Sequence, residues 1–273
     1  MPNKVLGFIG AGNIASSLIG GLLADGWPAD RICAADLDMQ RLAELQRAGI
    51  HVETDNTQVA RKADILVLAV KPQIMQQVAR EVAPIVQQRQ PLIISVAAGI
   101  TLTSLDEWLG GGLSLVRCMP NTPALVRSGA TALLANPLCS DNQKSQAEAI
   151  LRSVGLAVWV DEESHLDTVT ALSGSGPAYF FLLMEAMEQA AVDMGLDREK
   201  ARLLTQQTAL GAARVAIESE ETPAELRRRV TSPGGTTEQA IRTFENKAFL
   251  ALVLEAMQAA RNRSFELSNA PGK

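Results

Sequence analysis

Cysteine and histidine are scarce, with 3 and 2 residues in a chain of 273. Cys33, Cys118 and Cys139 lie far apart with no CxxC spacing, so neither a disulfide framework nor a zinc knuckle is indicated and we expect reduced core thiols. His51 and His165 fall in no HxxxH or HxxE pattern, and no metal site is expected. His165 has two glutamates nearby and could act as a general base, but a solvated loop histidine is favoured.

Excess charge and long apolar runs are also lacking. The net charge is only -5 and no Lys/Arg-rich block occurs, which argues against a nucleic-acid partner. The most apolar later stretch contains Glu185, Glu188 and Asp193, so no membrane segment is expected. The first four residues run straight into a strand pattern and leave no room for a signal peptide, so a cytoplasmic location is expected. With 47% hydrophobic residues, the chain can bury a large core and should form two domains.

A glycine turn between an apolar run and a helical pattern, residues 4–15, organises the first half. Gly10 is expected to make the turn, Gly12 to let the backbone approach a pyrophosphate, and Ala15 to pack the helix on the strand. The N–H groups at the helix start, at Asn13 and Ile14, would form an anion site. A GxGxxA pattern alone is a weak signal, since an unrelated turn can carry it. Its position after a predicted strand favours a bound dinucleotide.

A carboxylate supports that interpretation. Asp36 ends a second apolar run, about 20 residues beyond the glycine turn, where dinucleotide folds place the residue that binds the ribose. Such a carboxylate accepts from a 2′-hydroxyl and repels a 2′-phosphate. We therefore expect NADH to be used at least as well as NADPH, although Arg41 could swing across to a phosphate.

The first half, residues 1–161, alternates short apolar runs with helical patterns. The runs are nearly continuous in Ile, Leu, Val and Ala, as strands buried on both faces of a parallel sheet require. A doubly wound, mainly parallel Rossmann domain follows. The expected strands are 5–9, 31–35, 64–70, 92–96, 113–117 and 156–160; the expected helices are 39–48, 72–87, 102–109 and 142–153, the last with Asp141 as N-cap.

Three loops after these strands should rim one cleft, because ligands bind beyond the carboxyl ends of parallel strands. Each loop alone could be ordinary turn chemistry, but their shared edge favours function. They contain Val70, Lys71 and Pro72; Ala97 and Ala98; and Asn121 and Pro123.

The second half, residues 162–273, shows helical patterns only, at 175–194, 198–218 with Asp197 as N-cap, 223–230, 236–244 and 247–267. The helix after Pro177 is apolar round most of its circumference, so we expect an all-helical domain that pairs with its copy. Residues 173–178 and 231–237 each place glycines and hydroxyls before a helix. Either could be an ordinary cap; two together favour an anionic small-molecule site.

Six motifs in order resemble the pyrroline-5-carboxylate reductase family over essentially the whole chain. Residues 226–240, LRRRVTSPGGTTEQA, look like the family signature. The other motifs are GFIGAGNIA from Gly7, VKPQ from Val70, VAAG from Val96, MPNTPA from Met119 and SGSGPA from Ser173.

The resemblance implies reduction of 1-pyrroline-5-carboxylate to L-proline by NADPH or NADH, in a homodimer or a ring of dimers with interlocked C-terminal helices. Thr237 would hydrogen-bond the ring nitrogen as the catalytic residue. The other implied substrate contacts are Ser232, Gly234, Gly235 and Ser175. Near the nicotinamide and its ribose would lie Ala97, Ala98, Asn121 and Pro123, with Val70, Lys71 and Pro72 lining the nucleotide groove and Asn56 at the adenosine.

Two alternatives remain. A β-hydroxyacid dehydrogenase shares the glycine turn and a helical second domain, but it relies on a catalytic lysine that residues 173–178 lack. A non-catalytic nucleotide-sensing module would account for the Rossmann pattern of the first half, but it would give residues 232–237 no function.

Overall fold

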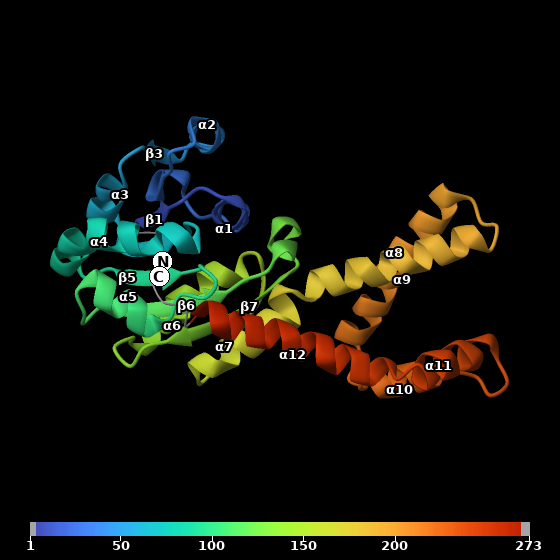
Figure 1. Cartoon of the computed structure of the whole chain (residues 1–273). Helices are drawn as coiled ribbons and strands as arrows, with labels where there is room; N and C mark the ends of the chain where they lie inside the picture. Colours follow the sequence, from blue (N-terminus) through green and yellow to red (C-terminus); the bar gives the residue numbers. More distant parts are fainter. Residues whose placement is uncertain (1–3, 269–273) are drawn as a thin grey trace. The chain divides into compact units, whose positions relative to one another are not determined.

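A computed structural model describes residues 4–268, in which an eight-stranded sheet forms the larger unit (Figure 1). The strand order is β3-β2-β1-β4-β5-β6-β7-β8, and every pair is parallel except the antiparallel β6 and β7. This confirms the predicted doubly wound, mainly parallel fold. The strands are β1 (Leu6–Ile9), β2 (Ile32–Ala35), β3 (His51–Glu53), β4 (Ile65–Leu68), β5 (Leu92–Ser95), β6 (Leu115–Met119), β7 (Gly129–Ala135) and β8 (Gly155–Trp159).

Helices bury both faces of this sheet, because the central strands carry apolar side chains on both sides. Phe8 packs with Leu18 of α1 and Ile150 of α6 in one core. Its neighbour Ile9 points the other way, into a core with Met75 of α4. The helical segments are α1 (Asn13–Ala24), η1 (Ala29–Arg31), α2 (Met39–Arg47), α3 (Asn56–Lys62), α4 (Pro72–Arg89), α5 (Leu102–Leu109), η2 (Thr122–Val126), α6 (Asp141–Arg152), α7 (Glu163–Val169) and the π-helical turn η3 (Thr170–Gly174).

Two strands, the helices α3 and α7, and one helix cap differ from the prediction. β3 has only three residues, and β7 has the sequence GATALLA, whose small residues carry no strand periodicity. The N-cap of α6 is Ser140, which forms a capping box with Gln143, so the assignment of Asp141 as N-cap is wrong. Asp141 is the first residue of the helix, where its negative charge still favours the helix dipole.

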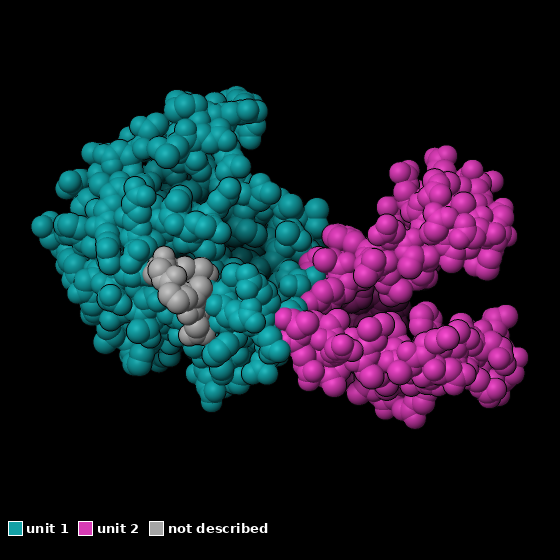
Figure 2. Space-filling model, viewed as in Figure 1, with its two compact units in different colours: residues 1–175, 260–273 teal, residues 176–259 magenta. Residues whose placement is uncertain are grey.

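The second unit is residues 176–259 and is all-helical, as Figure 2 marks in magenta. Its helices are α8 (Gly176–Asp193), α9 (Arg198–Glu218), α10 (Pro223–Arg229), α11 (Thr236–Asn246) and α12 (Phe249–Ser268), whose last turns from Ala260 belong to the sheet unit. Asp197 caps α9 by accepting from the Lys200 N–H at 3.2 Å, as predicted. The predicted domain boundary between residues 161 and 162 stays a prediction.

Large apolar side chains cover the helices of the second unit. Phe180, Phe181 and Leu182 of α8 are 64%, 63% and 66% exposed, and Leu250 of α12 is 76% exposed. Apolar area of this extent marks an interaction surface. Among residues 4–268, none of the helices combines the length and the hydropathy that crossing a membrane requires.

Candidate dinucleotide and substrate sites

The predicted dinucleotide residues gather at one edge of the sheet. Strands β1, β4, β5 and β6 are parallel neighbours, so the loops after them meet at their carboxyl ends. Adjacent strand ends are hydrogen-bonded directly: the Ala69 N–H donates to the Ile9 carbonyl at 2.8 Å, and the Val96 N–H to the Leu68 carbonyl at 3.1 Å. The structure therefore brings the glycine turn and the three predicted loops together.

The glycine turn fits a pyrophosphate. Gly10 has φ +92°, and a Cβ there would lie 2.8 Å from the backbone carbonyl of Ala69. Gly12 precedes α1 as its N-cap without any side-chain cap, and a Cβ on it would meet only the Arg41 guanidinium at 3.7 Å. The N–H groups of Asn13 and Ile14 thus begin a helix in front of open space. Ala15 is fully buried, as its predicted packing role requires.

The carboxylate of Asp36 is built into the same turn. Its Oδ2 accepts from the Ala11 N–H at 2.6 Å, and its Oδ1 from the Asp38 N–H at 2.9 Å. Asp38 in turn caps α2 and pairs with Arg41 at 3.3 Å. The negative charge of Asp36 is therefore fixed beside the glycine turn, whereas the positive charge of Arg41 is partly neutralised.

The predicted nucleotide groove lies at the starts of two helices. Lys71 is the N-cap of α4 and Pro72 is its first residue, directly after Val70. Asn56 opens α3, and its Nδ2 donates to Glu81 of α4 at 3.1 Å. These residues therefore lie at the starts of α3 and α4, the helices that follow strands β3 and β4.

The predicted nicotinamide loops differ in how they are held. Ala97 is buried, and its N–H donates to the Ser95 Oγ at 3.4 Å, while Ala98 is exposed. Asn121 is 9% exposed and uses both ends of its amide within the protein. Its Nδ2 donates to the Ser173 carbonyl at 2.9 Å, and its Oδ1 accepts from the Ala130 N–H at 2.8 Å.

Asn121 therefore fastens the loop that contains Pro123 to the π-helical turn η3 and to β7. Sequence reasoning placed Asn121 at the nicotinamide and missed this fastening role, because its partner Ser173 is 52 residues away in the chain. The contact of Asn121 with the nicotinamide stays a prediction.

The predicted substrate loop lies in the helical unit, before α11. Gly235 is the N-cap of α11 and has no side-chain cap, so the first N–H groups of the helix lack a partner of that kind. The Gly234 N–H donates to Glu238 at 2.8 Å, and the Gly235 N–H to the Ser232 carbonyl at 3.0 Å. Within residues 4–268, the hydroxyl of Thr237 makes no hydrogen bond, nor does that of Ser232.

The predicted residue Ser175 lies in the sheet unit, immediately after η3. Its N–H donates to the Thr170 carbonyl at 2.8 Å, which closes the π-helical turn. π-helical turns within α-helices occur frequently at functional sites, so η3 supports the predicted binding role of this segment.

The cysteines are buried in the sheet unit, and His165 lies on one of its helices. All three cysteines are free and buried, which confirms reduced core thiols. Burial raises the pKa of Cys33 to about 11 and also raises the pKa of Cys118. His165 is exposed on α7 rather than in a loop. Across the described residues, no cluster of three or more His, Cys, Asp or Glu side chains is placed to hold a metal ion.

Comparison with known proteins agrees with this geometry. Residues 5–99 match the family model described as NADP oxidoreductase, coenzyme F420-dependent, and residues 163–267 match pyrroline-5-carboxylate reductase dimerisation. Together with the Rossmann sheet and its glycine turn, these matches define a nicotinamide-dependent oxidoreductase with a dimerisation domain.

Individual relatives identify the family. A pyrroline-5-carboxylate reductase from Pseudomonas aeruginosa is 53% identical over 100% of both chains. A solved pyrroline-5-carboxylate reductase from Coxiella burnetii is 46% identical with a TM-score of 0.94, covering 98% of this chain and 99% of that one. The Plasmodium falciparum pyrroline carboxylate reductase with NADP bound is 30% identical, with a TM-score of 0.87 and coverage of 98% and 100%. The chain belongs to the pyrroline-5-carboxylate reductase family.

Proposed function

We propose that the protein reduces 1-pyrroline-5-carboxylate to L-proline with a hydride from a reduced nicotinamide dinucleotide, the last step of proline synthesis. One observation carries the proposal beyond family membership. Two helices, α1 and α11, begin at glycine N-caps without side-chain caps, one at the sheet edge and one after the signature loop. These starts suit two anions, a pyrophosphate and a small carboxylate.

The dinucleotide would lie across the carboxyl edge of the sheet. Gly10, Gly12 and the start of α1 from Asn13 to Ala15 would hold the pyrophosphate, because a Cβ at Gly12 would stand in otherwise open space. The remaining contacts follow the predicted order: Asp36 at the ribose, Asn56 at the adenosine, Val70, Lys71 and Pro72 along the groove, and Ala97, Ala98, Asn121 and Pro123 toward the nicotinamide. When bound, the reduced nicotinamide supplies the hydride.

The substrate carboxylate would be held by Ser232, Gly234 and Gly235 at the start of α11, with Ser175 as a further contact. The N–H group of Gly234 is bonded to Glu238, so the carboxylate must either replace that bond or use the next N–H groups along the helix. The unbonded hydroxyl of Thr237 would hydrogen-bond the ring nitrogen.

The reaction needs few acid–base residues. The hydride adds to the carbon of the C=N bond, and the electron pair of that bond moves to the nitrogen. A protonated cyclic imine is already electrophilic, so the protein needs mainly to orient it and exclude water. Orientation supplies on the order of 7 to 11 kcal/mol in favourable intramolecular reactions. The proton that makes the imine nitrogen cationic before hydride transfer would come from water, with Thr237 as a relay, because a threonine hydroxyl is a poor acid.

The position of Asp36 supports use of NADH at least as well as NADPH. A carboxylate fixed at the glycine turn by two backbone N–H groups cannot swing away from a 2′-phosphate. Arg41 is the available cation, but it is paired with Asp38. A preference for NADPH above tenfold in kcat/KM would contradict this part of the proposal.

The helical unit supports a homodimer. Between Gly176 and Ala259 only Gly176, Ala201 and Thr205 are buried, so these helices need a second surface to cover their apolar side chains. The dimerisation model matched over residues 163–267 agrees with a homo-oligomer formed through these helices. A ring of such dimers is the larger assembly that we propose alongside the dimer.

Steady-state oxidation of NADH and NADPH with 1-pyrroline-5-carboxylate tests the proposal, with proline identified as the product. Turnover to proline is expected with both cofactors. Nicotinamide binding without turnover of this or a larger cyclic imine would favour the sensing-module alternative. Turnover of a β-hydroxyacid instead would favour the dehydrogenase alternative.

A further inference from the structure

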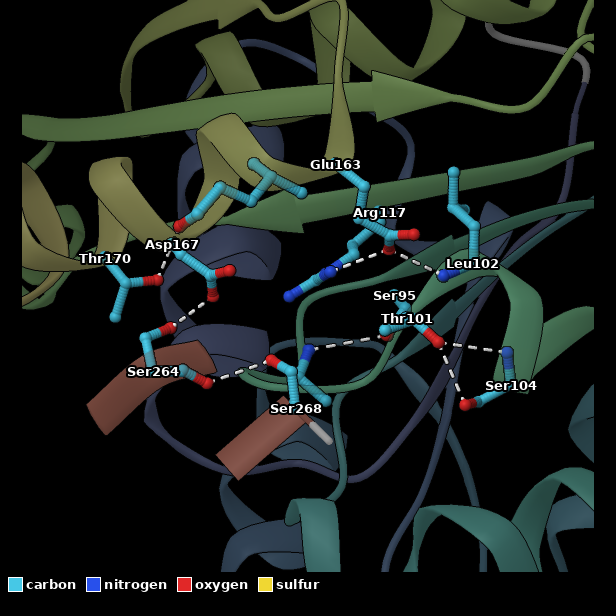
Figure 3. A network of polar contacts seen from close by, with 12 residues as sticks. Ser95, Thr101, Leu102, Ser104, Arg117, Glu163, Asp167, Thr170, Ser264 and Ser268 are labelled. Carbon is cyan, nitrogen blue, oxygen red and sulfur yellow. Dashed lines mark hydrogen bonds and ion pairs between the residues drawn. The ribbon is translucent and has the colours of Figure 1, made fainter. Parts of the chain in front are cut away.

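An ion pair between a buried arginine and a partly exposed glutamate holds the loop proposed to lie under the nicotinamide. Figure 3 shows Arg117 reaching from β6 toward Glu163, the first residue of α7. The Glu163 Oε1 accepts from an Arg117 guanidinium nitrogen at 2.7 Å and from the Leu102 N–H at 2.8 Å. The side chain of Arg117 is only 6% exposed, and within residues 4–268 Glu163 is its one ion-pair partner.

The two bonds of Glu163 fix the far end of that loop. The loop leaves β5 after Ser95 and enters α5 at Leu102, so it contains Ala97 and Ala98. At its near end, the Ser95 Oγ accepts from the Ala97 N–H at 3.4 Å. At its far end, Glu163 binds the first N–H of α5. Because Arg117 pairs in register with Ser95, the backbone of Arg117 lies beside the start of the loop, while its guanidinium bonds to Glu163 at the far end.

We infer that Glu163 is a positioning residue, which sets the loop of Ala97 and Ala98 for hydride transfer by joining Arg117 to the start of α5. This inference rests on the proposed function, in which that loop contacts the nicotinamide. Glu163 is not placed against the substrate or the dinucleotide; it acts through the Leu102 backbone.

The geometry sets what each substitution removes. Alanine at position 163 removes both bonds and leaves the buried Arg117 charge without its carboxylate. Aspartate keeps the charge but is one methylene shorter, so it cannot reach Arg117 and Leu102 together. Glutamine keeps the length and an oxygen that can accept from the Leu102 N–H. If Glu163 acts by positioning the loop, the glutamine variant should retain more enzyme activity than the aspartate variant.

A second buried bond on α7 provides the matched control. Asp167 accepts from the Ser264 Oγ at 2.7 Å, and the two side chains are 8% and 7% exposed. Figure 3 shows Asp167 on α7, the helix that begins at Glu163, and Ser264 on α12. Neither Asp167 nor Ser264 bonds to the loop, so Ser264→Ala should loosen α7 without releasing α5.

The experiment compares dissociation constants for NADH and for ADP-ribose, which lacks the nicotinamide, together with kcat, in the full-length enzyme. We expect Glu163→Ala and Glu163→Asp to lower kcat at least tenfold and NADH affinity about fivefold, while ADP-ribose affinity changes less than twofold. Glu163→Gln should restore the ratio of the two affinities to within about twofold of wild type. Ser264→Ala should lower Tm and leave that ratio unchanged.

Several outcomes would overturn the inference. One is a wild-type kcat and affinity ratio in the aspartate variant, which keeps the charge and is therefore informative even if the alanine variant does not fold. Equal losses of NADH and ADP-ribose affinity, or the same loss in Ser264→Ala, would also assign Glu163 a purely structural role. A wild-type enzyme that neither binds NADH nor reduces 1-pyrroline-5-carboxylate would instead refute the proposed function.

Discussion

Substitution of Gly12 by valine separates cofactor binding from folding. The residue has φ -69°, which any residue adopts, and a Cβ on it meets only the Arg41 guanidinium at 3.7 Å. The fold should therefore accept the side chain. Its two methyl groups would, however, fill the space in front of α1 that we assign to the pyrophosphate.

The expected magnitudes differ for the two properties. Blocking two charge-assisted hydrogen bonds from the helix start costs roughly 3 kcal/mol or more, which is on the order of 100-fold in Kd. Valine is a poorer N-cap than glycine, so stability should fall by only about 1 kcal/mol. For a chain of this size, that lowers Tm by about 2–4 °C.

Gly10→Ala is the contrasting variant, because that position has φ +92° and a Cβ there would lie 2.8 Å from the carbonyl of Ala69. The left-handed conformation alone costs a non-glycine residue roughly 1–2 kcal/mol, and the close contact adds to it. Titration of NADH fluorescence and thermal unfolding, performed on both variants, provide the test. NADH affinity of Gly12→Val within tenfold of wild type would refute the placement of the pyrophosphate.

Three further predictions concern the substrate, the cofactor and pH. Thr237→Ala should lower kcat about tenfold or more with NADH affinity intact; full activity would show that the hydroxyl does not serve the ring nitrogen. Asp36→Asn should raise kcat/KM for NADPH relative to NADH, measured in parallel assays, and an unchanged ratio would show that the carboxylate does not face the 2′ position. Hydrogen bonds from Trp159 and Arg152 hold the pKa of Glu148 below its usual value of 4.5. That stabilisation is present above pH 4.5 and is lost as the pH falls below it. Trp159→Phe should therefore make Tm fall less steeply as the pH is lowered through the acid range. A Tm–pH curve that runs parallel to that of the wild type would contradict this.

The sequence predicted the doubly wound, mainly parallel fold around the glycine turn because these strands are apolar without interruption and the crossover rule leaves few topologies. It did not predict β7, which pairs antiparallel with β6 and parallel with β8, because GATALLA carries neither strand nor helix periodicity. The short polar strand β3 was missed for a related reason: three residues are too few for a pattern.

Side-chain partnerships across long separations lay beyond sequence reasoning. Glu163 and Leu102 are 61 residues apart, and Asn121 and Ser173 are 52 apart. Only the folded chain brings such pairs together, and no local pattern marks them. The individual site residues and the expected cytoplasmic location stay predictions.

The most direct test of the account is transfer of deuterium from dinucleotide that carries two deuterium atoms at the nicotinamide C4. The account predicts proline with one deuterium on the ring carbon that formed the C=N bond, and none at the carbon bearing the carboxylate. Proline without deuterium, or no proline at all, would contradict hydride transfer to the cyclic imine.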